Sequence, residues 1–592
     1  MTDRLESLAR IIQRAPTSKD ADSAFVTINQ IIRGLGVPCE RTTAERTVDL
    51  FLRQWSLEKL VQAENAARVG LDQLLLIKSW ICIGVGLSSK HDNSSGHTSC
   101  AVCDVLFVHA NILQRWLPLI VKSLHEGDVS ADIQRNYINL TLTFLHDIIQ
   151  KKHPLQTLFV NNPRLLNTLL CIWKDIIRNK MSFPQDLYEP IFRTCSDLIF
   201  VYLNAFASKP REVWDECTPK PVESVALTAI EFLDEILSDF DKYGYLVYHG
   251  VTIISHLLNR KDLNGRHTST FQRLVGKILE VLWKIVGRPP SSPSTDREKY
   301  IQGLHFSAIS TCITCFCQMV DCYFDGVTWV LQLIRECVLQ ALLRCDAWLC
   351  DAECEEPPHL PKFLTQLLPL YLTYRSVLEA SQKELIRITQ AGLDEHISNP
   401  GLNRSWTQFK AAVEVQCTIL DQISEEPVYL CEKCANPRCY SVWNKNVRTA
   451  EFTLRRCGGC RVAGYCSSEC QKMHWKCSKF PHSEGCNYEK SLFRENSLSD
   501  VSSRDIKHLK RLAQYHVWAL AKMPEHSFKF ASSLFQTVNV ELDFTKVPYQ
   551  LSVKTLPEGQ DIMINILVGR GDCSRTWTYI AFAEQVMPFI GL

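Results

Sequence analysis

Apolar side chains recur with the period of an α-helix over most of the first 425 residues. Two stripes illustrate the pattern: Ile133, Tyr137, Leu140, Phe144 and Ile148 in one segment, and Leu274, Ile278, Val281 and Ile285 in another. Spacings of three and four residues place these side chains on one face of each helix, where a neighbouring helix can bury them. The chain is therefore predicted to begin with a long helical body.

Breaks between the stripes fit the same interpretation. Gly287-Arg288-Pro289-Pro290 follows the second stripe and predicts a helix end, and Thr295-Asp296 can cap the next helix. About fifteen amphipathic segments of this kind are joined by short polar loops. Many amphipathic helices over this length, without a tight repeat motif, favour a degenerate α-solenoid of the armadillo or HEAT kind, with an irregular helical domain as the alternative.

The pattern changes to a two-residue period near the C-terminus. The alternating apolar positions are Val538, Val540, Leu542 and Phe544, then Tyr549, Leu551 and Val553, then Ile562, Ile564 and Ile566. Such alternation predicts strands, and a helix over residues 505–521 precedes them. We expect a mainly α protein with three parts: a solenoid-like helical body over 1–425, a cysteine-rich segment over 426–490 and a small α+β module over 491–592.

Composition narrows the class of protein. The 592 residues are 46% hydrophobic and 22% charged, which is typical of a folded chain with more than one core. A net charge of +1 gives no overall attraction to nucleic acid or membrane. The first residues, MTDRLESLARIIQRA, lack the apolar core of a signal peptide, and the apolar stretch 74–87 is too short to span a bilayer. We expect an intracellular protein, nuclear or cytoplasmic, without a membrane partner.

Cysteines are concentrated in one place. Of 26 in the chain, nine lie between Cys431 and Cys486. In a reducing compartment such a cluster indicates metal binding, whereas scattered cysteines are small buried apolar residues. We apply the second interpretation to Cys312, Cys315, Cys317 and Cys322, and to the Cys100–Cys103 pair with His91 and His97 nearby.

The candidate ligands fall into pairs. These are Cys434 with Cys439, Cys457 with Cys460, Cys466 with Cys470, and His482 with Cys486. Two to four residues separate the members of each pair, which lets both reach a single ion. Eight ligands satisfy two tetrahedral zinc ions, so we predict two Zn²⁺ per chain. Gly458-Gly459 inside the second pair allows the backbone to fold tightly round the metal.

The run CGGCRVAGYCSSECQKMHW, preceded by CANPRCYSVW and followed by HSEGC, resembles a MYND-type zinc finger. Tyr465, Gln471 and Trp475 stand at positions typical of that family. The order of helical body, finger and short α+β tail is also similar to that of fungal MYND-domain proteins. The resemblance implies two interleaved sites, with Cys434, Cys439, Cys466 and Cys470 holding one ion, and Cys457, Cys460, His482 and Cys486 holding the other.

Two ligand assignments stay open. Cys431 stands three residues before Cys434 and offers a different first pair that would replace Cys439. The gap from Trp475 to His482 is longer than is common in the family, so Cys477 or His474 could take the place of His482.

MYND fingers commonly bind other proteins through short proline-containing peptides, and the resemblance implies the same here. Gln471 and Trp475 lie at i and i+4 of the helix expected after Cys470, so they share one face and could hold such a peptide. The alternative is that Trp475 only packs over the metal site, as a small domain with little core requires.

Other functions have less support. Residues 431–486 carry ten basic and four acidic residues, but seven thiolates and two Zn²⁺ reduce this surplus from +6 to +3. Direct nucleic-acid contact is therefore not expected. No SET-domain motif or common catalytic motif is present, and eight protein ligands leave no open zinc position. We expect a non-enzymatic, zinc-binding adaptor, with transcriptional regulation as its context. The alternatives are a nucleic-acid-associated zinc protein and a divergent methyltransferase-related protein.

Overall fold

A computed structural model of the chain describes residues 138, 142, 145–146, 163–178, 185–205, 222–258, 268–288, 290, 293–322, 326–350, 359–423, 431–432, 434–436, 439, 454–459, 463–476, 481–484, 486–487, 502–523, 537–544, 546, 550–556, 561–570 and 573–582. The five apolar residues of the first predicted stripe and the Cys100–Cys103 pair lie outside this set.

The chain divides into two compact units, Met1–His256 and Leu257–Leu592. Helices of the first unit are α10 (Pro163–Arg178), α11 (Gln185–Ala205), α13 (Val222–Ser238), α14 (Phe240–Tyr243), the 3₁₀ turn η2 (Gly244–Leu246) and α15 (Val247–Leu258), which runs two residues past the boundary. The Phe232 ring lies 5.0 Å from both Trp173 and Phe192. Aromatic packing between α10, α11 and α13 therefore forms part of the core of this unit.

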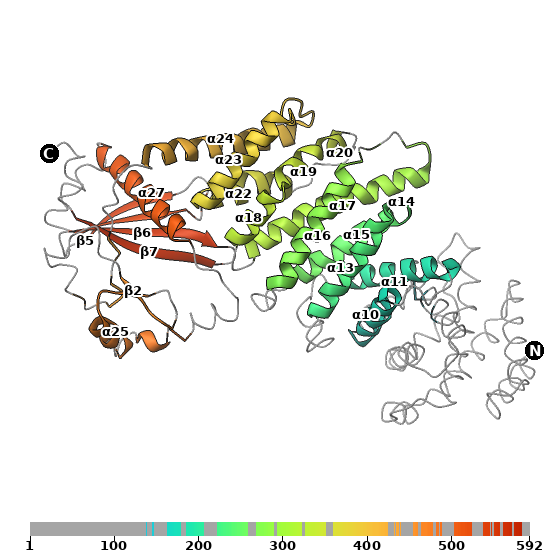
Figure 1. The fold of residues 1–592 in the computed structure, drawn as a ribbon, viewed down its shortest axis with the longest axis horizontal. Helices are drawn as coiled ribbons and strands as arrows, with labels where there is room; N and C mark the ends of the chain where they lie inside the picture. Colours follow the sequence, from blue (N-terminus) through green and yellow to red (C-terminus); the bar gives the residue numbers. More distant parts are fainter. Residues whose placement is uncertain are drawn as a thin grey trace, which may run out of the picture. The chain divides into compact units, whose positions relative to one another are not determined.

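Helices also dominate the second unit (Figure 1). They are α16 (Thr268–Val286), α17 (Asp296–Cys322), α18 (Gly326–Arg335), α19 (Val338–Arg344), α20 (Asp346–Cys350), α21 (His359–Lys362), the π-helical turn η4 (Phe363–Leu367), α22 (Leu368–Tyr371), α23 (Arg375–Gln390), α24 (Pro400–Ile423), α25 (Ser468–Trp475) and α27 (Ser503–Lys522). The described residues are thus mainly α-helical, as predicted. Contacts join helices adjacent in sequence, such as α16 with α17, but also α18 with α23. The solenoid stays a prediction.

The second apolar stripe is confirmed. Its four residues are fully buried on α16, which ends at Val286, directly before the predicted break. The next helix begins at Asp296 with a reciprocal cap. The Thr295 hydroxyl accepts a hydrogen bond from the Glu298 N–H (3.2 Å), and the Glu298 carboxylate accepts one from the Thr295 N–H (3.2 Å). This capping box satisfies two donors that the first turn of α17 would otherwise leave open.

Helix α17 carries the apolar cysteine cluster. Cys312, Cys315 and Cys317 are buried, as predicted, and the side chain of Cys322 lies outside the described residues. By length and hydropathy alone the stretch Asp296–Asp321 could cross a membrane. Half of its most apolar window is buried inside the protein, which is typical of a core helix. A bent pair, Gly326–Arg335 with Val338–Leu349, passes the same test only if its two parts form one span.

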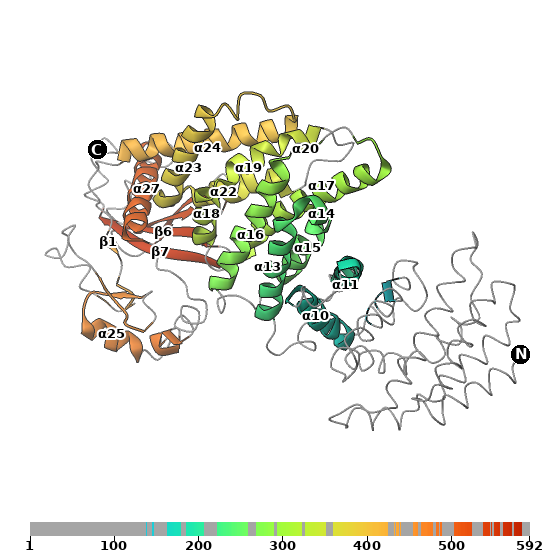
Figure 2. The same cartoon turned by 45° about the vertical axis from the view of Figure 1, so that its right-hand side comes forward.

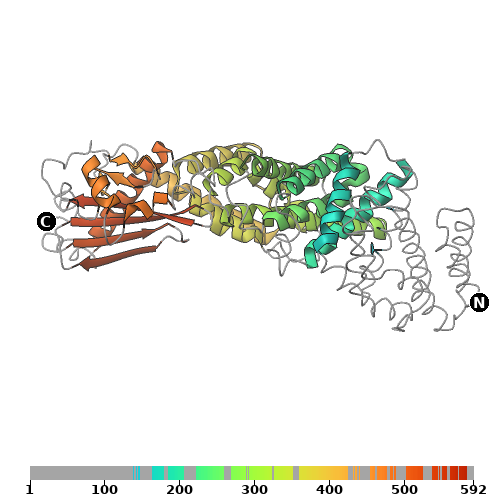
Figure 3. The same ribbon diagram turned by 90° about the horizontal axis from the view of Figure 1, so that it is seen from below.

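The predicted strands belong to a five-stranded sheet with the order β1-β7-β6-β4-β5. Its strands are β1 (Cys431–Glu432), β4 (Thr537–Asp543), β5 (Gln550–Leu556), β6 (Asp561–Arg570) and β7 (Cys573–Phe582). Pairing is parallel between β4 and β6 and antiparallel elsewhere. Figure 3 shows the long strands lying next to one another. Strands β1 and β7 were not predicted: β1 has only two residues and so carries no alternation, and no strand pattern was identified beyond Ile566.

Helix α27 lies across the sheet and also contacts α23 and α24 (Figures 1 and 2). Its N-terminus is tied to that of α23 by one carboxylate. Asp505, only 4% exposed, accepts hydrogen bonds from the Ser376 N–H (2.8 Å) and hydroxyl (3.1 Å). The Asp505 N–H in turn donates to the Ser502 hydroxyl (3.0 Å). Because carboxylates are favoured at helix N-termini, Asp505 stabilises α23 while its own helix is capped by Ser502.

Two histidines are buried on α27. Burial lowers the pKa of His508 to about 4, with a further contribution from the nearby Arg375, and burial lowers the pKa of His516 to about 4. The His516 ring also contacts Phe544 of the sheet (6.0 Å between centroids). Both imidazoles are therefore neutral at pH 7.

This burial predicts acid sensitivity. An unfolded histidine takes up a proton near pH 6.5, whereas these two do so only near pH 4, so the free energy of unfolding falls as pH drops through that window. The loss is at most about 3 kcal/mol per histidine. Urea unfolding at pH 7 and pH 4.5 should show a smaller difference for His508→Gln/His516→Phe than for wild type. His396→Gln, which removes an exposed histidine, is the control. An unchanged difference in the double variant would contradict the prediction.

Candidate metal centre

Two groups of metal-ligating atoms form within residues 431–487. The first cluster comprises the sulfurs of Cys434, Cys439, Cys466 and Cys470, all within 4.8 Å of one another. The second cluster comprises the ligand atoms of Cys457, His482 and Cys486, also within 4.8 Å. Cys460, the eighth predicted ligand, lies outside the described residues. Each cluster could hold a metal ion.

Distances between the sulfurs fit tetrahedral coordination. Cys466 Sγ lies 3.4 Å from Cys439 Sγ and 3.3 Å from Cys470 Sγ, and Cys457 Sγ lies 3.7 Å from Cys486 Sγ. Sulfurs placed ~2.3 Å from a central ion would be about 3.8 Å apart, so these three separations are close to the tetrahedral value. A disulfide would require about 2.05 Å, and none of these five cysteines forms one.

A short hairpin lies between the two clusters. Its strands are β2 (Arg455–Arg456) and β3 (Gly464–Tyr465), which pair antiparallel. On one side the Cys457 N–H donates to the Ala463 carbonyl (2.8 Å), and on the other the Ala435 N–H donates to the Gly464 carbonyl (2.8 Å). The hairpin thereby fixes the start of the second cluster and lies against the residue after Cys434. Ligands of the two clusters alternate along the chain.

Helix α25 completes the first cluster. Ser467 caps the helix, because its hydroxyl accepts the Cys470 N–H (3.1 Å). Cys466 precedes this cap and Cys470 lies in the first turn, so the pair spaced by three residues converges at a helix N-terminus.

The two glycines of Cys457-Gly458-Gly459-Cys460 differ in their surroundings. A Cβ atom on Gly459 would lie 2.7 Å from the Cys486 sulfur and 3.7 Å from the Cys457 sulfur. A Cβ atom on Gly458 would meet nothing within 4 Å. Only Gly459 is therefore required by close approach of the backbone to the second cluster.

Aromatic rings surround the histidine of the second cluster. His474 stacks on His482 at 5.3 Å, and its Nδ1 lies 3.1 Å from the Tyr465 hydroxyl. Trp475 meets His482 edge-on at 5.8 Å. Of the three candidates for this ligand, His482 lies in the cluster, His474 lies beside it, and Cys477 lies outside the described residues.

The structure describes one of the two possible first pairs. Cys439 completes a group of four sulfurs with Cys434, Cys466 and Cys470. The backbone of Cys431 instead forms β1, where it pairs with Ile580 of β7. The structure therefore brings Cys439 to the first cluster, and the side chain of Cys431 lies outside what it describes.

Gln471 and Trp475 share one face of α25 but differ in their contacts. The Gln471 amide donates to the Cys457 sulfur (3.5 Å), so its polar group faces the second cluster. Trp475 is 40% exposed, and its ring lies 5.8 Å from that of His482 at an interplanar angle of 70°. Sequence spacing predicts that both lie on one side of α25, but it gives no signal that Gln471 would approach a cysteine fourteen residues earlier.

Burial shapes the electrostatics of the ligands. It raises the pKa of the Cys434 thiol, so a positive ion is needed to stabilise the thiolate there. Burial and the neighbouring His474 lower the pKa of His482, which favours the neutral imidazole. Neutral imidazole and thiolate are the forms that bind a metal ion.

Comparisons with protein families, with curated proteins and with solved structures give no match to this chain. The geometry of the two clusters is therefore the basis for assigning a function.

Contact between Gly459 and the second cluster predicts a selective effect. Gly459→Ala should reduce metal retention by the full-length protein, because the new Cβ displaces the Cys486 sulfur. Gly458→Ala is the matched control and should retain metal like wild type, because its Cβ meets open space. Metal content after dialysis against a weak chelator, measured by plasma mass spectrometry, compares the two. Equal retention would show that the close approach is not required.

Proposed function

We propose that residues 431–487 form a two-zinc finger of the MYND type and that the protein is an adaptor that binds other proteins through it. The observation that carries the proposal is the alternation of two ligand groups along one short segment. The MYND resemblance implies the same interleaving.

The donor set supports zinc in particular. Thiolates with one imidazole at tetrahedral spacing are the ligands of structural zinc sites, whereas magnesium and calcium prefer oxygen. In this proposal Cys460 supplies the fourth ligand of the second cluster, since two residues separate it from Cys457. Both sites are then closed by protein ligands, which leaves no position for a reacting molecule and favours a structural role over catalysis.

The exposed part of Trp475 supports a binding role for the finger. A tryptophan that is 40% exposed and packed in a T-shaped arrangement with His482 offers an apolar surface. Such a surface suits an extended, proline-containing peptide, which loses little conformational freedom on binding. The amide of Gln471 is engaged with the Cys457 sulfur, so Trp475 is the principal contact in this proposal.

Metal analysis tests the zinc assignment. The full-length protein should contain two zinc ions per chain, and Cys466→Ser should contain one, because it removes a ligand of the first cluster only. Cys171→Ser, which replaces an exposed cysteine of α10, should still contain two. A wild-type ratio near one, or an unchanged ratio in Cys466→Ser, would contradict the two-site arrangement.

Peptide binding tests the adaptor role. An array of proline-containing peptides probed with full-length protein should yield binders, and Trp475→Ala should weaken them by about thirtyfold, since truncating an aromatic hot spot costs ~2 kcal/mol or more. Met473→Ala is the matched control: Met473 is also exposed on α25 but lies two residues away, on another face.

Zinc content is measured on the same variants. Full zinc with lost binding in Trp475→Ala assigns the residue to the peptide contact. Loss of zinc in that variant assigns it to packing over His482 instead. Full zinc content with unchanged peptide affinity in Trp475→Ala would show that the finger is not the recognition surface.

A further inference from the structure

Solvent reaches the thiols of the first cluster unequally. Cys434 and Cys470 are 2% and 6% exposed, whereas Cys439 and Cys466 are only partly buried. Oxidation of a cysteine by a small molecule in solution requires an accessible sulfur with thiolate character. Metal binding supplies the thiolate character, since the thiolate is the form that binds an ion. Cys439 and Cys466 therefore meet both conditions for oxidation, and the two buried thiols lack access.

Cys466 also lies beside two further sulfurs. Its Sγ is 3.3 Å from Cys470 Sγ and 3.4 Å from Cys439 Sγ. Because a disulfide needs ~2.05 Å, an approach of about 1.3 Å joins Cys466 to either neighbour. A partly exposed cysteine with a second thiol within reach is the arrangement found in redox-sensing sites. Cys466 is thus the member of the cluster best placed both to react and to be trapped as a disulfide.

The described thiols of the second cluster are better protected. Cys457 and Cys486 are each 2% exposed. The Gln471 amide donates a hydrogen bond to the Cys457 sulfur (3.5 Å), which stabilises charge on a thiolate and makes it a weaker nucleophile. The backbone at Gly459 lies against the Cys486 sulfur, where a Cβ atom on that glycine would be only 2.7 Å away. An oxidant in solution therefore meets more resistance at this cluster than at Cys466.

We propose that Cys466 is a site of oxidation by hydrogen peroxide, and that its oxidation empties the first cluster of metal while the second cluster keeps its own. The inference rests on the proposed zinc finger and names a way in which that site is regulated. Its basis is the difference in exposure between the clusters together with the two sulfurs beside Cys466.

The chemistry takes two steps. The Cys466 thiolate attacks one oxygen of the peroxide, so that an S–O bond forms, the O–O bond breaks, and hydroxide leaves a sulfenic acid behind. The thiolate of Cys439 or Cys470 then attacks that sulfur, which forms the disulfide and releases a second hydroxide. The two thiolates lose two electrons, hydrogen peroxide takes up both, and solvent protons convert the hydroxides to water. The cluster has then lost two of its four ligands and no longer holds an ion tightly.

Zinc release from the full-length protein tests the selectivity. Wild type is treated with hydrogen peroxide while a chromogenic chelator reports the zinc set free, and peptide mass spectrometry after alkylation locates the disulfide. We expect one zinc ion per chain to leave at least tenfold faster than the second, together with a disulfide from Cys466 to Cys439 or Cys470. Release of both ions at one rate, or a first disulfide that does not contain Cys466, would overturn the proposal.

A variant that keeps a zinc ligand tests Cys466 itself. Cys466→His replaces the thiolate by an imidazole, which also binds zinc, and should slow the fast release at least tenfold. Cys171→Ser is the control, because it removes an exposed thiol outside both clusters and should release zinc like wild type. Fast release from Cys466→His would overturn the proposal. If this variant does not retain zinc, the disulfide map of wild type still decides.

The zinc content before oxidation separates this inference from the proposed function. A wild-type protein without two zinc ions contradicts the two-zinc finger, and the disulfide map then tests the reactivity of Cys466 alone. Two zinc ions without selective release would leave the finger in place and overturn only the oxidation site.

Discussion

The fold of residues 431–487 depends on bringing its cysteine sulfurs close together. Among the described residues of this segment, the buried core comprises Cys434, Cys457, Tyr465, Cys470 and Cys486. Four of these five side chains are thiols, and small domains with little apolar core commonly need a metal or another cross-link to fold. Thiolates that share a cation can supply the missing free energy. The hairpin, the serine cap of α25 and the close approach at Gly459 all bring sulfurs to tetrahedral separation.

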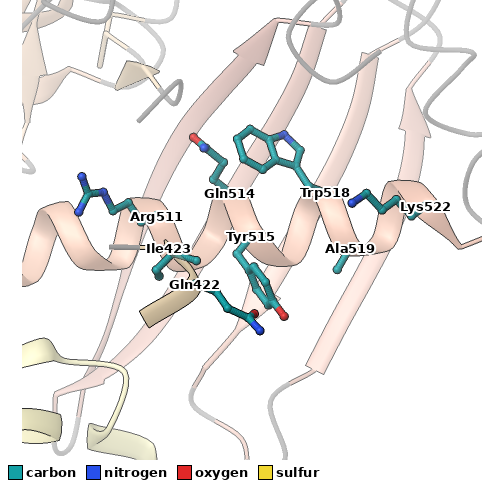
Figure 4. A pocket seen from close by; sticks show the side chains of 8 residues that line it. All are labelled: Gln422, Ile423, Arg511, Gln514, Tyr515, Trp518, Ala519 and Lys522. Carbon is teal, nitrogen blue, oxygen red and sulfur yellow. The ribbon is translucent and has the colours of Figure 1, made fainter. Parts of the chain in front are cut away.

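Helix α27 buries polar side chains between helices and a sheet, and these side chains compensate for the cost of burial in different ways. Asp505 offsets its burial by accepting hydrogen bonds at the N-terminus of α23, and His508 offsets its burial by staying neutral. Arg511, which Figure 4 shows on α27, has neither option, because a guanidinium cannot lose its proton and its Nε has no acceptor among the described residues. Burial of α27 therefore has two results: Asp505 ties the start of the helix to α23, and Arg511 keeps an unsatisfied donor further along the helix.

Prediction from sequence succeeded where a local pattern decides the outcome. The apolar stripe of α16 and the strand alternation near Val540 correspond to buried positions, and the helix predicted over 505–521 matches α27 at Ser503–Lys522. Seven of the eight residues named as ligands from their spacing lie in the two described groups. Contacts set by tertiary structure gave no local signal. Examples are the amide of Gln471 on the Cys457 sulfur and the burial of α27 on more than one side, although its sequence is rich in basic residues.

Strand β1 has a consequence for the order of folding. Cys431 pairs with Ile580, a contact across 149 residues, whereas β6 and β7 are joined by a tight connection. Closing so long a loop costs more entropy than closing a hairpin, so the short hairpins can form first and this pair last. During synthesis the first cluster emerges from the ribosome well before the strand that its leading residues will join. The whole cysteine-rich segment is therefore present on the growing chain while that edge of the sheet is still unmade.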